Sequence, residues 1–101
     1  MLRFDKLTLK AQEALQSAQE IAAQYSQQQI EPLHILAALL GQREGIVPPL
    51  LGKLGVRLEA LAPDVESALE RLPKVSGAAQ NFLSSSSNEL LKIAYDEASQ
   101  F

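Results

Sequence analysis

The chain has 101 residues, of which 47% are hydrophobic and 21% are charged. This balance is typical of one folded domain with a modest core, and it excludes an intrinsically disordered chain, which has too few apolar groups to bury. The net charge is −3 and no Lys or Arg cluster occurs, so we expect no nucleic-acid binding, which needs grouped basic side chains. The chain has no cysteine, no long apolar run and no signal peptide, so we expect no disulfide, no membrane contact and a cytoplasmic location.

A first helix is predicted from about Thr8 to Tyr25, because its apolar residues recur every three or four positions and form one stripe. The stripe consists of Leu7, Ala11, Ala14, Leu15, Ala18, Ile21, Ala22 and Tyr25. Thr8 is well placed to cap this helix, since its hydroxyl can accept a hydrogen bond from a backbone N–H of the first turn.

A second helix is predicted to start at Glu31 and Pro32 and to end at Gly41. Proline suits a first helical position, because the N–H that it lacks would have no helical partner there. The segment is apolar on most sides, so we expect it to be the buried central helix of the domain. His34, the only histidine, lies in this segment, and a packed or half-exposed helix residue is favoured over a catalytic or pH-sensing role.

Two further helices are predicted before the chain changes character. A short one covers about residues 46–55, entered through prolines and closed by glycine. The next covers about residues 58–72 with leucines on one side. Pro63 falls near its first turns and leaves the start open between Leu58 and Asp64.

Residues 73–87 are rich in Pro, Gly and Ser, which is typical of a linker, and we expect their four consecutive serines to be solvated. A fifth helix is predicted over about residues 87–101. Ser86 and Glu89 have the spacing of a capping box, in which each side chain bonds the backbone N–H of the other residue.

The fifth helix matches the first when the chain is shifted by 76 positions. The shift aligns Leu7 with Leu83, Thr8 with Ser84, Glu13 with Glu89, Leu15 with Leu91, Ala18 with Ala94, Ala22 with Ala98, Gln24 with Gln100 and Tyr25 with Phe101. We therefore predict an all-α fold with a four-helix repeat over residues 1–75, a linker over 76–87 and the first helix of a second repeat over 88–101. An unpartnered helix cannot bury its stripe alone, so we expect a longer parent chain and self-association of these residues. The alternative is a complete chain whose fifth helix packs back on the first four.

Five segments together resemble the Clp N-terminal domain family. They are FDKLT at 4–8, AQEAL at 11–15, IEPLHILAALL at 30–40, PLL at 49–51 and RLPKVSG at 71–77. The last segment is similar to the ClpB branch of the family.

The resemblance implies two four-helix repeats that hold no nucleotide and belong to a hexameric AAA+ ATPase. Such chaperones thread unfolded or aggregated polypeptides, in possible cooperation with a DnaK-type chaperone, and their N-terminal domains contact these clients through apolar surface. ATP would be bound elsewhere in the parent, since no phosphate-binding loop motif occurs in this sequence. A docking module for adaptor proteins is the alternative. We expect no enzyme, since no nucleophile–base set, paired carboxylates or metal cluster is present.

Candidate binding residues follow from these expectations. Thr8 corresponds to an early threonine that the family associates with chaperone function, although helix capping is the favoured role. The family's functional acidic residues lie in the second repeat, beyond this sequence. Clients would meet exposed apolar side chains, for which packing within the domain is an equal alternative. The candidates lie on the fifth helix, beside the first, and are Leu90, Leu91, Ile93, Ala94 and Tyr95.

Overall fold

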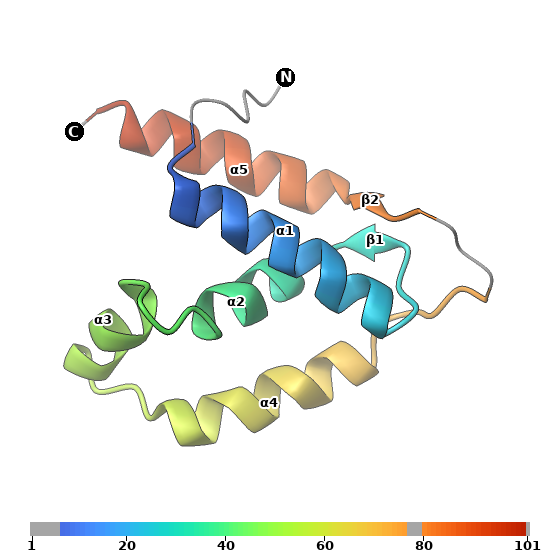
Figure 1. Cartoon of the computed structure of the whole chain (residues 1–101), viewed down its shortest axis with the longest axis horizontal. Helices are drawn as coiled ribbons and strands as arrows, with labels where there is room; N and C mark the ends of the chain where they lie inside the picture. Colours follow the sequence, from blue (N-terminus) through green and yellow to red (C-terminus); the bar gives the residue numbers. More distant parts are fainter. Residues whose placement is uncertain (1–6, 77–79, 101) are drawn as a thin grey trace.

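Helices dominate the computed structural model, which describes residues 7–76 and 80–100 (Figure 1). The elements, in chain order, are α1 (Leu9–Gln24), β1 (Gln29–Ile30), α2 (Pro32–Leu40), α3 (Val47–Lys53), α4 (Leu58–Glu70), β2 (Phe82–Leu83) and α5 (Ser85–Ala98). The predicted all-α class is confirmed. The first three residues of the 4–8 segment, residues 77–79 of the predicted linker and the match of Tyr25 with Phe101 lie outside the described residues.

The packing of α1 on α2 forms the centre of the core. Ala14, Ala18 and Ala22 lie on one side of α1 and are 2%, 0% and 0% exposed. Because these side chains are small, they allow α2 to approach α1 closely, and Ile35 and Ala38 of α2 join the same buried cluster. The predicted stripe of α1 is therefore confirmed as the buried side of this helix.

The central position predicted for the second helix is confirmed. α2 contacts α1, α3, α4 and α5, and Figure 1 shows it between α1 and α4. Pro32 is its first residue and Gly41 caps its end, as the sequence predicts. A helix that is apolar on most sides is covered from several directions, because each uncovered apolar side chain would lose the free energy of burial.

α4 begins at Leu58 and continues through Pro63, so the alternative start at Asp64 is wrong. The proline ring removes one backbone hydrogen bond near the start of the helix. Val65 and Leu69 lie further along and are 6% and 2% exposed. Their burial holds the helix against α2 in spite of the proline.

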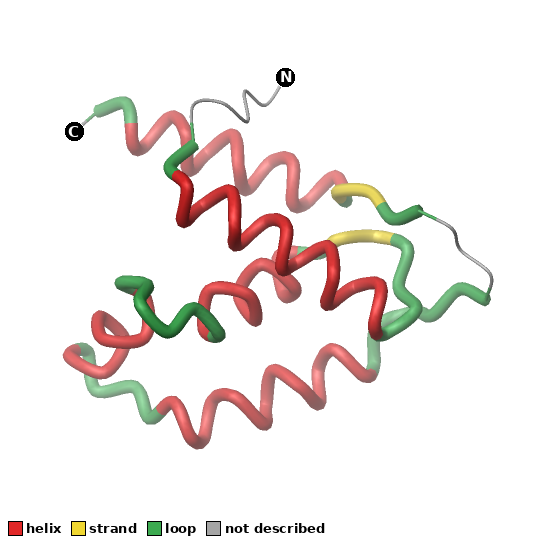
Figure 2. Tube along the Cα trace, viewed as in Figure 1, coloured by secondary structure: helices red, strands yellow, loops and turns green. Residues whose placement is uncertain are grey.

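A short parallel sheet joins two segments that are far apart in the sequence (Figure 2). Gln29 of β1 pairs with Phe82 of β2, and Ile30 pairs with Leu83. The predicted linker over residues 73–87 contains the second of these strands, which was not predicted. Strands of two residues have no period that a sequence pattern can reveal, so only the pairing itself identifies them.

The start of α5 also differs from the prediction. The helix begins at Ser85, and its N-cap is Ser84, whose Oγ accepts a hydrogen bond from the N–H of Ser87 at 3.1 Å. The predicted capping box of Ser86 and Glu89 is wrong, because Ser86 already lies inside the helix. The strand fixes the backbone up to Leu83, so the first serine after it takes the cap.

Two of the four serines are buried and attach α5 to β1. Ser84 is 3% exposed and Ser87 is 0% exposed. The Ser87 hydroxyl donates to the carbonyl oxygen of Ile30 at 2.6 Å, and the Ser84 N–H donates to the same oxygen at 3.1 Å. The predicted solvation of the serine run holds only for Ser85 and Ser86, which are exposed.

The two helix starts that the 76-residue shift aligns have the same local geometry. Thr8 has φ −66° and ψ 163°, and Ser84 has φ −67° and ψ 164°. Each hydroxyl accepts a hydrogen bond at 3.1 Å from the N–H three residues further on. The predicted cap at Thr8 is confirmed. The division into a repeat over 1–75, a linker over 76–87 and a second-repeat helix over 88–101 stays a prediction.

We expect Ser87→Ala to lower the free energy of unfolding by about 1–2 kcal/mol, because the variant loses a buried hydrogen bond to the carbonyl of Ile30. Urea denaturation followed by circular dichroism measures this loss. Ser86→Ala is the matched control: it lies in the same helical turn, is exposed, and gains the same helix propensity. Equal stability of the two variants would show that the buried hydroxyl does not anchor α5.

Candidate interaction surface

α5 carries large apolar side chains that the rest of the described chain leaves uncovered. Leu90, Ile93 and Tyr95 are 40%, 51% and 40% exposed. Ala94 is also exposed, and Leu91 is half-buried. The structure therefore brings all five candidates from the fifth helix together on one element. We call these five residues the α5 surface.

Positions of α5 that correspond to buried positions of α1 are open to solvent. The 76-residue shift aligns Ala14, Ala18 and Ala22 of α1 with Leu90, Ala94 and Ala98 of α5. The three alanines of α1 are buried against α2, whereas their counterparts in α5 are exposed. Part of the α5 surface thus has the character of a helix–helix contact without a partner helix in the described residues.

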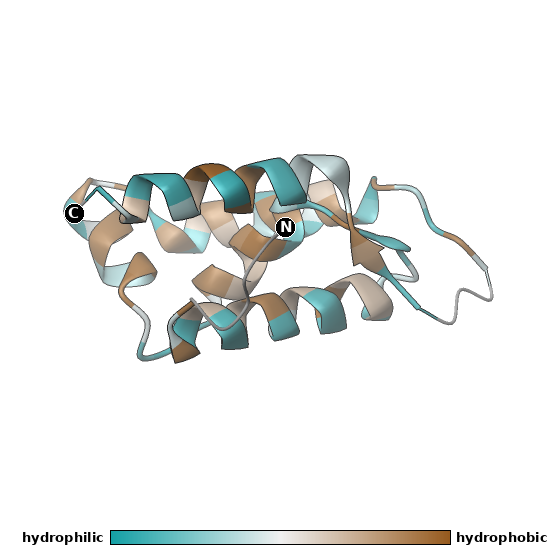
Figure 3. Ribbon diagram, turned by 90° about the horizontal axis from the view of Figure 1, so that it is seen from above, coloured by the Kyte–Doolittle hydropathy of each residue, from teal (hydrophilic) through white to brown (hydrophobic). Residues whose placement is uncertain are grey.

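α5, whose candidates are predicted to lie beside the first helix, is held by two other elements. Its main contacts are with β2 and α2. Seen from above in Figure 3, α1 and α5 run along two sides of the molecule. The pairing of β2 with β1 and the buried serines place α5 next to the start of α2.

Thr8 is separate from the α5 surface. It lies exposed at the start of α1, and its Oγ1 accepts a hydrogen bond from the N–H of Ala11 at 3.1 Å. The favoured capping role is confirmed. A hydroxyl that accepts this bond can still donate its proton to a bound molecule.

An apolar stripe along α3 and its two cap residues was not predicted from the sequence. Ile46, Leu50 and Leu54 are spaced by four residues and are 79%, 52% and 71% exposed. No residue of α3 is buried, and the helix is shorter than predicted. The signal was present in the sequence: leucines occupy more than one side of a helix too short to be covered all round.

A buried polar cluster connects the end of α1 to α2 and α4. His34 is 0% exposed, and its Nδ1 accepts a hydrogen bond from the N–H of Glu31 at 2.8 Å. Its Nε2 therefore carries the proton and donates to Oε1 of Gln27 at 2.6 Å. The side-chain amide of Gln27 donates in turn to the carbonyl of Leu69 at 2.6 Å. The packed role favoured for His34 is confirmed, whereas Gln27 lies in a segment that the sequence shows only as a break.

The burial of His34 changes its acid–base behaviour. Removal of the ring from water lowers the pKa of His34 below its ordinary value of 6.5, and the carboxylate of Glu31 opposes this shift only in part. The neutral ring fits the cluster, because a proton on Nδ1 would face the N–H of Glu31. The histidine is thus part of the internal structure.

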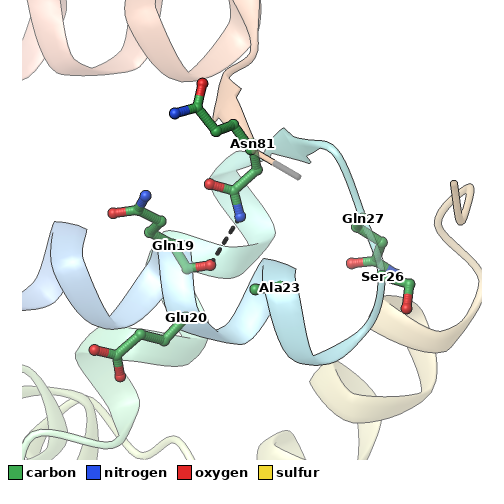
Figure 4. A pocket seen from close by; sticks show the side chains of 7 residues that line it. Gln19, Glu20, Ala23, Ser26, Gln27 and Asn81 are labelled. Carbon is green, nitrogen blue, oxygen red and sulfur yellow. Dashed lines mark hydrogen bonds between the residues drawn. The ribbon is translucent and has the colours of Figure 1, made fainter. Parts of the chain in front are cut away.

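A cleft of about 290 Å³ lies at the end of α1 (Figure 4). Amides make up most of its polar lining, and one hydrogen bond crosses it, from Nδ2 of Asn81 to the carbonyl of Gln19 at 2.9 Å. The lining residues are Gln19, Glu20, Ala23, Ser26, Gln27, Gln80 and Asn81. These residues include one carboxylate and no strong nucleophile, so they do not form a general acid–base pair.

The described part of the chain contains neither a metal-binding cluster of side chains nor a membrane-spanning helix. Over residues 7–76 and 80–100, no group of three or more His, Cys, Asp or Glu side chains is placed to hold a metal ion. Over the same residues, no helix combines the length and the apolar character that crossing a bilayer requires.

Comparison with protein families gives one match over nearly the whole chain. The family model of the Clp repeat (R) N-terminal domain matches residues 6–101. The chaperone protein ClpB of Clostridium tetani is 42% identical over 79 residues, which are 77% of this chain and 9% of that protein. The ClpB protein of Porphyromonas gingivalis is 38% identical over 97 residues, which are 96% of this chain and 11% of that protein. The chain thus spans about a tenth of these relatives.

Two solved structures have a similar fold. One comes from work on the ATPase ClpV, the TssB–TssC sheath and the accessory HsiE protein of type VI secretion. Its TM-score is 0.83 at 24% sequence identity, and the match covers 95% of this chain and 59% of that one. The other is described as containing a peptide from the SciI protein of a type VI secretion system. Its TM-score is 0.87 at 27% identity, over 96% of this chain and 61% of that one.

We expect the stability of the fold to fall as the pH drops below about 6.5. The unfolded chain protonates His34 near its ordinary pKa, whereas the folded chain resists protonation, so protons favour unfolding until the lower pKa of the folded state is passed. The contribution of neutral His34 to the free energy of unfolding is fully present above about pH 6.5. Below this pH, the free energy of unfolding falls by at most about 1.4 kcal/mol per pH unit. Urea denaturation between pH 5 and 7.5 measures the slope. His34→Gln, which removes the only histidine, should flatten it; an unchanged slope in the variant would contradict the assignment.

Proposed function

The chain belongs to the Clp repeat N-terminal domain family, and from this premise we propose that it binds exposed segments of unfolded or aggregated polypeptides for a ClpB-type chaperone. The α5 surface carries the proposal. Unfolded polypeptides differ from folded ones in presenting apolar side chains and free backbone, and an exposed apolar helix side gains free energy by burying such side chains. Leu90, Ile93 and Tyr95 are the residues exposed in this way.

We propose that binding is weak, with a dissociation constant in the rough range of micromolar or poorer. The exposed part of the α5 surface consists of a few half-covered side chains on one helix. Each contributes a small free energy, and a segment that is passed on for threading must also be released. Thr8 lies exposed at the start of α1 and serves mainly as the cap of that helix.

The remaining parts of the proposal concern the longer protein. A ClpB-type parent would bind and hydrolyse ATP in other domains, assemble as a hexamer in the cytoplasm and cooperate with a DnaK-type chaperone. The residues described here would form one repeat and the start of a second, and they would hold no cofactor themselves. Their part in the cycle is the first contact with the client.

Docking of a dedicated adaptor protein is the second candidate function. The solved structure with a SciI peptide favours it, because that fold is found there together with one particular peptide. An adaptor would bind as one folded partner in a fixed ratio and would not prefer unfolded protein. A pulldown that compares folded and unfolded forms of the same protein separates the two functions.

We expect Ile93→Ser to weaken the binding of an unfolded polypeptide about fivefold, because a half-exposed apolar side chain is lost from the α5 surface. Fluorescence anisotropy with a labelled, permanently unfolded protein measures the dissociation constant. Leu54→Ser is the matched control, since it removes an apolar side chain that is 71% exposed on α3. An equal loss in both variants, or equal binding of the same protein in its folded form, would contradict the proposal.

A further inference from the structure

The edge of β2 that faces away from β1 offers backbone groups without a partner in the described residues. The Phe82 N–H donates to the carbonyl of Gln28 at 2.9 Å, and the Ser84 N–H donates to the carbonyl of Ile30 at 3.1 Å. Alternate residues of a strand direct their peptide groups to opposite sides. The N–H and C=O of Leu83 therefore point away from β1.

Little of the described structure covers this edge. β2 has its main contacts with β1 and α5, while β1 lies between β2 and α1. Over residues 7–76 and 80–100, no main-chain hydrogen bond outside the sheet ladder involves the N–H or C=O of Leu83. The side chain of Phe82 beside it is 52% exposed. The edge is therefore open for further pairing, which proteins usually prevent at exposed strands.

We infer that the Leu83 edge of β2 binds an extended polypeptide segment as a third strand. This inference rests on the proposed function and specifies how a client is held. An extended backbone presents N–H and C=O groups at the spacing of a strand, which a helix does not offer. Every unfolded polypeptide has such a backbone, so pairing at this edge requires no particular client sequence.

The surroundings of the edge fit an unfolded client. The exposed ring of Phe82 provides an apolar contact next to the Leu83 edge. β2 leads directly into α5, because Ser84 is both the residue after the strand and the cap of the helix. A segment paired at Leu83 thus lies at the base of the helix that carries the α5 surface. Backbone pairing and apolar contact can then act on one client.

The other edge of the sheet is the natural internal comparison. The peptide groups of Gln29 point away from β2, as those of Leu83 point away from β1. β1 packs against α1, so a third strand on that side would meet the helix. The inference therefore concerns only the Leu83 edge, and Gln29 serves as its control.

The first test follows the backbone amides of the protein during binding. The probe is a labelled 12-residue peptide of mixed Val, Thr and Ser without stable structure, and its matched control carries N-methyl groups on four consecutive central residues. With the unmodified peptide at saturation, we expect hydrogen exchange at the Leu83 amide to slow about tenfold or more and exchange at Gln29 to stay unchanged. We expect the N-methylated peptide to bind at least fivefold more weakly, since it has lost its donors. Unchanged exchange at Leu83 in the saturated complex would overturn the inference.

A second test alters the protein. Leu83→Pro removes the outward N–H and keeps the Ser84 bond to β1, whereas Gln29→Pro removes the corresponding N–H at the other edge. We expect only the first variant to weaken peptide binding. If Leu83→Pro fails to fold, the affinities of the unmodified and N-methylated peptides for the unaltered protein still test the inference. If both peptides bind with equal affinity and Ile93→Ser binds unfolded protein more weakly, the pairing at the Leu83 edge is refuted and the proposed function stands. If the protein binds neither peptide and no unfolded protein, the inference and the proposed function are both refuted.

Discussion

The need to cover α2 determines the arrangement of the other elements. This helix is apolar on most of its circumference, and α1, α3, α4 and α5 all contact it. The alanine side of α1 provides the closest cover, and the buried cluster of His34 and Gln27 ties the end of α4 to the same place. The polar cluster is satisfied within the core, so it fixes the relative position of three helices without leaving a buried group unpaired.

α5 is held in a different way from the other long helices. Its start is fixed by the pairing of β2 with β1 and by the hydrogen bonds of Ser84 and Ser87 to Ile30, which are directional polar contacts. The rest of the helix is exposed apart from the half-buried Leu91. Attachment by polar contacts at one end is what leaves apolar side chains free for another molecule, because they are not required to hold the helix in place.

Periodic features were predictable from the sequence, and features made by long-range pairing were not. The stripes of α1 and α4, the proline at the start of α2 and the cap at Thr8 depend on residues within one or two turns. The strand pairing, the burial of Ser87 and the role of Gln27 depend on partners more than forty residues away. A polar residue in a linker-like segment gives no local sign that such a partner exists. The apolar residues of α5 could be identified from the sequence, whereas the strand pairing that fixes the start of this helix could not.

The buried and half-buried residues of α5 lie in its first half. The first turn contains the buried Ser87, the next contains the half-buried Leu91, and the last two turns are exposed throughout the described residues. Local stability follows the density of buried contacts, so the end of α5 should open and close more readily than its start. A helix of this kind can adjust to different polypeptides, while the contact between α1 and α2 remains undisturbed. The buried serines thus lie between the well-packed core of the molecule and the exposed part of α5.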